Sequence, residues 1–258
     1  MQRRTLLLSA AAAGLGAHAG PAEADVPAVI AAARPSVLPL GRLDPLASPR
    51  FAFRGTAFVV GDGRHVVSNQ HVVGSEADAT AQWAVQRPLP DGSQEWRRLE
   101  VVARDRAHDL VLLRMEGEPL PPLALAPEAV LREGLAVLLM GFPIGGVLGF
   151  QPVTHRGMVS SIAPIALPAA NAAQLRDQAI ASLRRGAFDI AQLDATAYPG
   201  NSGGPVLDAA SGQVVAVVNM VLVRGSREAA LSAPSGISYA IPGRWVRAMM
   251  QDAGIPAR

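Results

Sequence analysis

Short apolar runs separated by turn residues dominate the first half of the chain. These runs are "GTAFVVGDG", "RHVVSNQHVV", "ATAQWAVQRPLPDGSQEWRRLEVVARD" and "DLVLLRME". Runs of this length, rich in Val and bounded by Gly, Pro, Asn and Asp, are typical of β-strands. The dipeptides Asp62-Gly63 and Asp91-Gly92 lie between such runs and predict hairpin turns. This half of the chain is therefore predicted to consist of short β-strands.

A second group of apolar runs follows a proline-rich stretch over residues 119–130. Its members are "LAVLLMGFPIG", "QPVTHRGMVSSIAP", "AQLDATAYPGNSGGPVLDAASGQVVAVVNMVLV" and "GISYAIPG". The prolines of the intervening stretch prevent continuous strand pairing, so it is interpreted as a linker. Two groups of short strands joined by a linker predict an all-β chain made of two barrels or sandwiches.

Two segments depart from the strand pattern. Residues 168–186, "PAANAAQLRDQAIASLRRG", are rich in alanine and place apolar residues four apart, which predicts a helix. The tail "PGRWVRAMMQDAG" places Trp245 and Met249 on one helical face. We therefore expect a helical insertion in the second group of strands and a C-terminal helix that packs on a barrel.

The first 24 residues have the layout of a bacterial export signal. Arg3 and Arg4 precede an apolar run, which is followed by two A-x-A cleavage sites. The run is too short for a permanent membrane span, although an uncleaved anchor is the alternative. The adjacent arginines allow a twin-arginine route as well as the general secretory one. The mature protein is expected to be exported, periplasmic or secreted.

Composition narrows the function classes. Half of the 258 residues are hydrophobic, which is enough for a sizeable core. The chain contains no lysine, so all 23 basic residues are arginine and the net charge is only +2. Without a dense basic run, nucleic-acid binding is not expected. The chain has no cysteine and therefore no disulfide. No metal-ligand cluster or phosphate-binding loop appears, so neither cofactor nor metal is expected.

The stretch "GNSGG", Gly200–Gly204, fits two nucleophile motifs. Its G-x-S-x-G core matches the nucleophile elbow of α/β-hydrolases, which needs a histidine after the serine and a helix directly behind it. Here two strands follow instead. All five histidines precede Ser202: His18, His65, His71, His108 and His155. The order His, Asp, Ser of a two-barrel protease remains open.

Several blocks, taken in order, resemble the HtrA/Deg family of trypsin-like serine proteases. They are "GTAFVV...HVVSNQHVV", "RDRAHDLVLLRM", "VLLMGFPIG", "THRGMVSSI", "LDATAYPGNSGGPVLD" and "GISYAIP", and they cover about residues 50 to 245. The resemblance implies two chymotrypsin-like six-stranded β-barrels with the active site between them. The expected organisation is a signal peptide (1–24), an N-terminal lead-in (25–49), a first barrel (50–118), the linker (119–130) and a second barrel with the C-terminal helix (131–258).

The same resemblance implies site residues. Ser202 would attack the scissile carbonyl, His71 would transfer the proton, and Asp109 would orient the imidazole. The backbone N–H groups of Gly200 and Ser202 would form the oxyanion hole, with Asn201 shaping the turn between them.

Other histidines and aspartates compete for these roles. His65 and His108 are interpreted as surface or strand-edge residues. Asp105 competes with Asp109, but Asp109 lies at the mouth of a buried strand. Asp194 precedes the nucleophile by eight residues and is interpreted as structural.

The substrate pocket is expected to accept small or medium apolar P1 residues. In trypsin-like proteases a carboxylate six residues before the nucleophile selects Arg or Lys, and here that position is Thr196. The strand containing Val218, Asn219 and Met220 would form the pocket wall. Discrimination should be loose, because one methylene in such a pocket is worth only about 1 to 3 kcal/mol.

The sequence departs from the family in two places. It ends after the C-terminal helix, so we expect the PDZ domain common in the family to be absent. The insertion at 168–186 lies where the family has a mobile activation loop. One hypothesis is that it positions the oxyanion loops, and the other is that it is a surface cover.

Family trimers often use aromatic residues near the mature N-terminus, and residues 25–50 contain none. Oligomerisation is thus possible but unsupported.

The predicted function is that of an exported serine endopeptidase acting on unfolded or damaged proteins, with polypeptides as its only expected partners. A narrow processing protease or a glutamyl-type enzyme is the alternative within this class. A catalytically silent, protease-like binding module is the alternative outside it.

Overall fold

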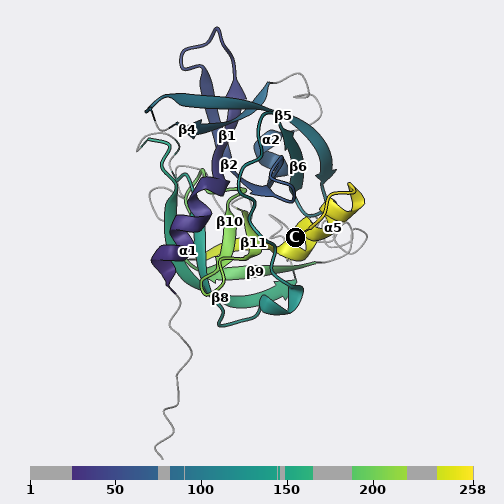
Figure 1. Ribbon diagram of the computed structural model, residues 1–258. Helices are drawn as coiled ribbons and strands as arrows, with labels where there is room; N and C mark the ends of the chain where they lie inside the picture. The colour runs from purple at the N-terminus through teal and green to yellow at the C-terminus, as the bar shows by residue number, and fades with distance from the viewer. Residues whose placement is uncertain are drawn as a thin grey trace, which may run out of the picture.

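Two closed antiparallel β-barrels make up most of the described protein. The computed structural model describes residues 25–74, 82–89, 91–143, 145, 149–164, 188–219 and 237–257. Figure 1 shows the strands of the first barrel above those of the second, with the C-terminal helix between them at one side. The predicted all-β fold of two six-stranded barrels is confirmed.

In the described part of the chain the first barrel closes in the order β1-β2-β3-β6-β5-β4. Its strands are β1 (Val37–Leu43), β2 (Phe51–Val60), β3 (His65–Asn69), β4 (Trp83–Pro88), β5 (Gln94–Asp105) and β6 (Leu110–Met115). The predicted turns join β2 to β3 and β4 to β5, with Gly63 and Gly92 at positive φ angles of 81° and 83°. A glycine in this region avoids the steric cost that a side chain would add.

The second barrel closes in the order β10-β11-β12-β9-β8-β7 over the described residues. Its strands are β7 (Ala136–Gly141), β8 (Val153–Pro164), β9 (Asp189–Asp194), β10 (Pro205–Asp208), β11 (Val214–Asn219) and β12 (Ile237–Pro242). All six residues of β11 are buried, because one face lies in the barrel and the other is covered by further elements. The expected helical insertion at 168–186 lies outside the described residues.

The N-terminal lead-in, expected at 25–49 outside the barrels, contains the first strand of barrel one. It begins with helix α1 (Val26–Ala33) and the 3₁₀ turn η1 (Arg34–Ser36). Strand β1 then pairs with both β2 and β4 and so closes the barrel. Pro39 has no backbone N–H to donate to the sheet, yet the first five residues of β1 are buried, and this burial outweighs the missing donor. The start of the first barrel therefore lies before residue 50.

Three apolar clusters form the core in the described part of the chain. One fills the first barrel and includes Val59 and Leu113, and another fills the second barrel and includes Leu139 and Leu193. The third lies between the barrels and also takes in side chains of α1 and of the C-terminal helix, Met250 among them. The barrels are thus joined by a continuous apolar interface, which fixes the surface on which a site between them can form.

The predicted C-terminal helix is present as α5 (Gly243–Asp252). It packs on β11 and β12 of the second barrel and also reaches β5 and β6 of the first (Figure 1). Met249 is buried, and Trp245, one turn earlier, lies beside it at the edge of the same core. Among the described residues, no helix is both long and apolar enough to cross a membrane. The linker carries the 3₁₀ turn η3 (Glu128–Val130) and an isolated β-bridge between Leu125 and Val214.

Candidate active site

Strand pairing brings His71 and Asp109 together. Strand β3 pairs with β6 so that Asn69 lies opposite Leu110. His71 follows β3 in the short helix α2 (Gln70–Val73), and Asp109 immediately precedes β6. Two residues that are far apart in the sequence therefore meet at one end of the first barrel.

His71 and Asp109 make two direct contacts. His71 Nδ1 lies 2.6 Å from Asp109 Oδ2, and the backbone N–H of His71 donates to Asp109 Oδ1 at 2.8 Å. The carbonyl oxygen of Asp109 also accepts from the backbone N–H of Gln70 and from Asn69 Nδ2, both at 3.1 Å. This arrangement fixes the carboxylate against one ring nitrogen and leaves the other for a substrate-side group.

Asn219 reaches the same carboxylate from the second barrel. Its Nδ2 donates to Asp109 Oδ2 at 2.8 Å. The sequence placed Asn219 in the wall of a substrate pocket, whereas its amide lies on Asp109. Asp109 Oδ2 is therefore approached by both the His71 ring and the Asn219 amide. Asn219 thus connects the two barrels at the His71–Asp109 pair. Its position in a predicted strand did not indicate this contact.

The loop carrying Ser202 is a chain of tight turns. The N–H of Asn201 donates to the carbonyl of Tyr198 at 3.0 Å, and Gly200 has a φ of 106°. A Pro-Gly pair with positive φ at glycine is typical of a type II turn. The next turn is closed by the N–H of Gly204, which donates to the carbonyl of Asn201 at 2.9 Å. Among the described residues no hydrogen bond uses the backbone N–H of Gly200 or Ser202.

Thr56 of β2 holds this loop against the first barrel. Its hydroxyl donates to the carbonyl of Gly200 at 2.7 Å and accepts from the N–H of Phe142 at 3.2 Å. Its backbone N–H donates to the carbonyl of Ser202 at 2.9 Å. Thr56 is not among the site residues predicted from the sequence. The available signal was a polar side chain inside the apolar run "GTAFVV", which here is fully buried.

Gly55 marks the close approach of Ser202 to the helix that carries His71. A Cβ atom at Gly55 would lie 2.9 Å from Val72 of α2 and 3.0 Å from the carbonyl oxygen of Ser202. Ser202 itself is buried, with 6% of its surface exposed. Among the described residues, no hydrogen bond joins the Ser202 hydroxyl to His71 in this conformation.

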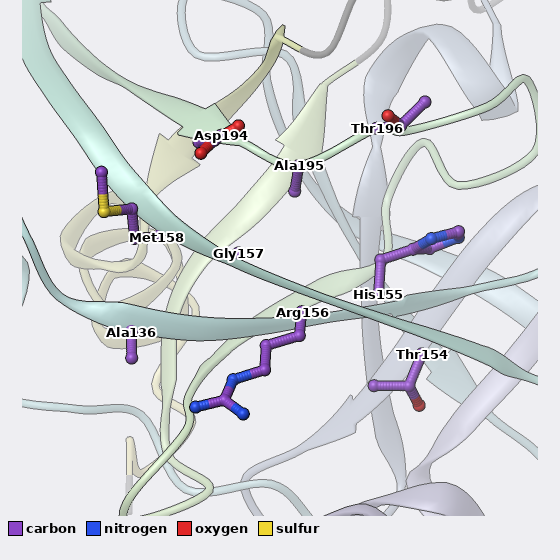
Figure 2. A pocket seen from close by; sticks show the side chains of 9 residues that line it. All are labelled: Ala136, Thr154, His155, Arg156, Gly157, Met158, Asp194, Ala195 and Thr196. Atoms are coloured by element: carbon purple, nitrogen blue, oxygen red, sulfur yellow. The ribbon is translucent and has the colours of Figure 1, made fainter.

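Thr196 lines an open cavity of about 770 Å³ between the end of β9 and strand β8. Figure 2 shows Thr196 on one side of this cavity, with His155 and Thr154 of β8 nearby. His155 lies opposite Leu139 in the strand register, and its ring centroid is 6.0 Å from that of Tyr198. Burial lowers the pKa of the His155 imidazole.

The remaining residues predicted for the pocket, and those predicted to lie outside the site, differ in burial and in hydrogen-bond partners. Val218 is fully buried in the core of the second barrel, and Met220 lies outside the described residues. His65 and His108 each form a pair with another carboxylate, at Asp62 and Asp105. Neither pair includes Asp109. Asp194 lies exposed at the end of β9, opposite both Met158 and Ile237.

Comparisons with known proteins show which family this chain resembles. Residues 55–217 match the family model of the trypsin-like peptidase domain. A probable periplasmic serine endoprotease DegP-like of Chlamydia trachomatis is 32% identical over 206 residues, which is 80% of this chain and 34% of the relative. Serine protease HTRA4 of Mus musculus is 29% identical over 233 residues, which is 88% of this chain and 40% of the relative.

Solved structures give the same fold. The HtrA-type protease AlgW with decapeptide aligns with a TM-score of 0.62 at 23% identity, over 89% of this chain and 67% of that one. The resemblance to HtrA/Deg proteases inferred from the sequence blocks is confirmed. The chain spans 34% to 40% of the length of the two curated relatives described above.

Proposed function

Because the chain belongs to the trypsin-like peptidase domain family, we propose that it is a serine endopeptidase that cleaves polypeptides through an acyl-enzyme intermediate. The observation that carries this proposal is the bidentate contact of Asp109 with His71, beside the glycine-rich loop that carries Ser202. The family order His, Asp, Ser is met by these three residues. The two other His–Asp pairs in the described part of the chain, His65–Asp62 and His108–Asp105, include neither His71 nor Asp109.

In the proposed mechanism Ser202 Oγ attacks the carbonyl carbon of the scissile bond. His71 Nε2 takes the hydroxyl proton and later gives it to the leaving amine, while a water molecule releases the acyl group by the reverse proton path. Asp109 keeps the proton of the imidazole on Nδ1 and stabilises the ring when it is charged. The amide of Asn219 holds Asp109 Oδ2 in place for this task.

The oxyanion of the tetrahedral intermediate is proposed to lie between the N–H groups of Gly200 and Ser202. Support comes from the turn at Tyr198–Asn201, which places Gly200 at positive φ and leaves both N–H groups without an intramolecular acceptor among the described residues. Donors that are fixed before the reaction stabilise the developing charge without reorganisation, and losing one costs about 3 kcal/mol. Thr56 supports this arrangement by holding the carbonyl of Gly200.

We further propose that the protein is exported and acts on unfolded polypeptides with small or medium apolar P1 residues. Thr196 at the position of a specificity carboxylate disfavours basic P1 residues. The signal-like residues 1–24 and the periplasmic relatives favour export. A loose apolar pocket would suit a protease that meets many exposed segments.

Active-site labelling tests the function. Wild-type protein should react with a fluorophosphonate probe, and Ser202→Ala should not. Casein digestion followed by mass spectrometry of the cut sites should then give apolar P1 residues. Absence of labelling and of casein cleavage in the folded wild type would instead favour the protease-like binding module. Cleavage after Glu would favour the glutamyl-type alternative.

A further inference from the structure

A second His–Asp pair lies directly before Asp109, in the turn between β5 and β6. His108 Nδ1 lies 2.6 Å from Asp105 Oδ2. The other carboxylate oxygen, Oδ1, accepts from the backbone N–H groups of Ala107 and His108, both at 3.1 Å. Asp105 therefore holds this turn through three contacts, and one of them depends on the side chain of His108.

The ring of His108 also binds the second barrel. It stacks on Trp245 of α5, with ring centroids 3.6 Å apart and an interplanar angle of 16°. Phe188, next to β9, meets the same ring edge-on at 4.6 Å. Arg244 lies over the Trp245 ring, 5.1 Å from its centroid. His108 thus bridges the turn of the first barrel and an aromatic pair of the second.

Asp109, which follows His108, has a backbone conformation that its surroundings must hold in place. Asp109 has a φ of 53°, and among the described residues it is the one non-glycine residue at positive φ. This region is unfavourable for a residue with a side chain and persists only where the surroundings fix it. The direction of the Asp109 carboxylate follows from this backbone conformation.

We propose that His108 is a positioning residue: held between Asp105 and Trp245, it fixes the β5–β6 turn so that Asp109 meets His71 in the orienting geometry. The inference rests on the proposed function, in which Asp109 orients His71. It gives helix α5 a role in the active site, because Trp245 supplies the stacking surface. A substitution in α5 would then lower the catalytic rate although α5 does not contact the substrate.

The pair His65–Asp62 offers a matched control. It has the same spacing of three residues and a similar contact, with His65 Nδ1 2.8 Å from Asp62 Oδ1. It lies at the start of β3, at the opposite end of the strand from His71. Removing the His65–Asp62 contact should lower the free energy of unfolding by a similar amount but should leave Asp109 in place.

The test compares His108→Leu, Trp245→Leu, Trp245→Phe and His65→Leu in the full chain. The substrate is a peptide taken from the casein cut sites. For His108→Leu and Trp245→Leu we expect kcat to fall about ten- to a hundredfold, a range set by small misplacements of catalytic groups, with KM nearly unchanged. Trp245→Phe should retain most of the activity, and His65→Leu should keep the wild-type kcat.

The inference fails if folded His108→Leu and Trp245→Leu keep the wild-type kcat, or if His65→Leu lowers kcat equally. If His108→Leu does not fold, the Trp245→Leu and Trp245→Phe pair decides, because neither alters the turn sequence. The imidazole NMR resonances of His71 are also recorded in Ser202→Ala, with and without Trp245→Leu, and displacement of Asp109 from Nδ1 should change them. This measurement needs no turnover, so an inactive wild type would contradict the proposed function while the NMR resonances still test the role of His108.

Discussion

Thr56 shows how one hydroxyl can connect two barrels. It donates to the carbonyl of Gly200 and accepts from the N–H of Phe142, and it is fully buried. Removing the hydroxyl leaves two backbone groups without their partner. An unsatisfied buried group costs about 1–3 kcal/mol, compared with the roughly 0.5–1.5 kcal/mol that a typical hydrogen bond contributes net to stability.

We therefore expect Thr56→Val, which keeps the shape of the side chain, to lower kcat about tenfold or more through a displaced oxyanion loop. Thr56→Ser restores the hydroxyl and should recover most of the rate. Steady-state kinetics on a casein-derived peptide, with thermal melts to verify folding, measure both. Equal activity of Thr56→Val and Thr56→Ser would show that the loop does not depend on this contact.

Asn219 gives a second prediction at the same scale. Its amide approaches Asp109 Oδ2, which His71 Nδ1 also approaches. Asn219→Ala should lower kcat, but by less than the roughly 10⁴-fold expected when the orienting aspartate of a triad becomes an amide. The comparison is with Asp109→Asn measured on the same peptide. A loss in Asn219→Ala as large as that in Asp109→Asn would contradict a supporting role.

The sequence was sufficient for some of these residues and not for others. His71 and Asp109 could be selected because the order of motifs left few alternatives, and the structure places them in direct contact. Thr56 was not selected, and Asn219 was selected only as a residue of the pocket wall, because each acts through a hydrogen bond to the other barrel. Such a contact depends on how the barrels pack, and the polar position of Thr56 in an apolar run does not reveal its partner.

At the scale of elements, local patterns predicted strands and turns but misplaced the start of the first barrel. Strand β1 has a proline at position 39 and no alternation, yet it closes the barrel between β2 and β4. Pairing on both edges is a long-range property that strand propensity does not measure. Helix α5 was predictable from its amphipathic spacing, whereas its contact with His108 was not.

The loop between β9 and β10, which carries Gly203, allows a prediction about the stability of its turn. Gly203 has a φ of 83°, and a Cβ atom there would collide with the carbonyl oxygen of Thr56 and the hydroxyl of Ser68. Gly92 has the same φ of 83°, but nothing lies within 4 Å of its Cβ position. Gly92→Ala should therefore cost only the left-handed backbone penalty of about 1–2 kcal/mol.

Gly203→Ala should cost clearly more than Gly92→Ala, since it adds a steric clash to the same backbone penalty. Urea denaturation of both variants measures the difference in the free energy of unfolding. The fluorophosphonate labelling rate should fall in Gly203→Ala and stay at the wild-type value in Gly92→Ala. Equal destabilisation of the two variants would mean that the loop can move away from Thr56 at little cost.

At the scale of the whole molecule, the site depends on the packing of the two barrels. The shared apolar cluster, the Thr56 hydroxyl and the Asn219 amide all cross the same boundary. The proposed nucleophile comes from one barrel and the proposed base and acid from the other. Small shifts between the barrels should therefore affect rate before they affect substrate binding.

His155 links the stability of the whole molecule to pH. It lies on β8 beside Leu139, and burial lowers its pKa below the ordinary value of 6.5. The unfolded chain then binds a proton more readily than the folded one. Stability from this group is complete above about pH 6.5, falls as pH drops from there to the folded pKa, and is constant below it.

We expect His155→Leu to remove this dependence. The wild-type free energy of unfolding minus that of the variant should be flat above about pH 6.5 and should decrease as pH falls below it. Urea titrations at a series of pH values give the difference directly, and taking the difference cancels the titration of groups common to both proteins. A difference that stays flat, or rises as the solution becomes more acidic, would mean that the His155 ring is not held in its neutral form by burial.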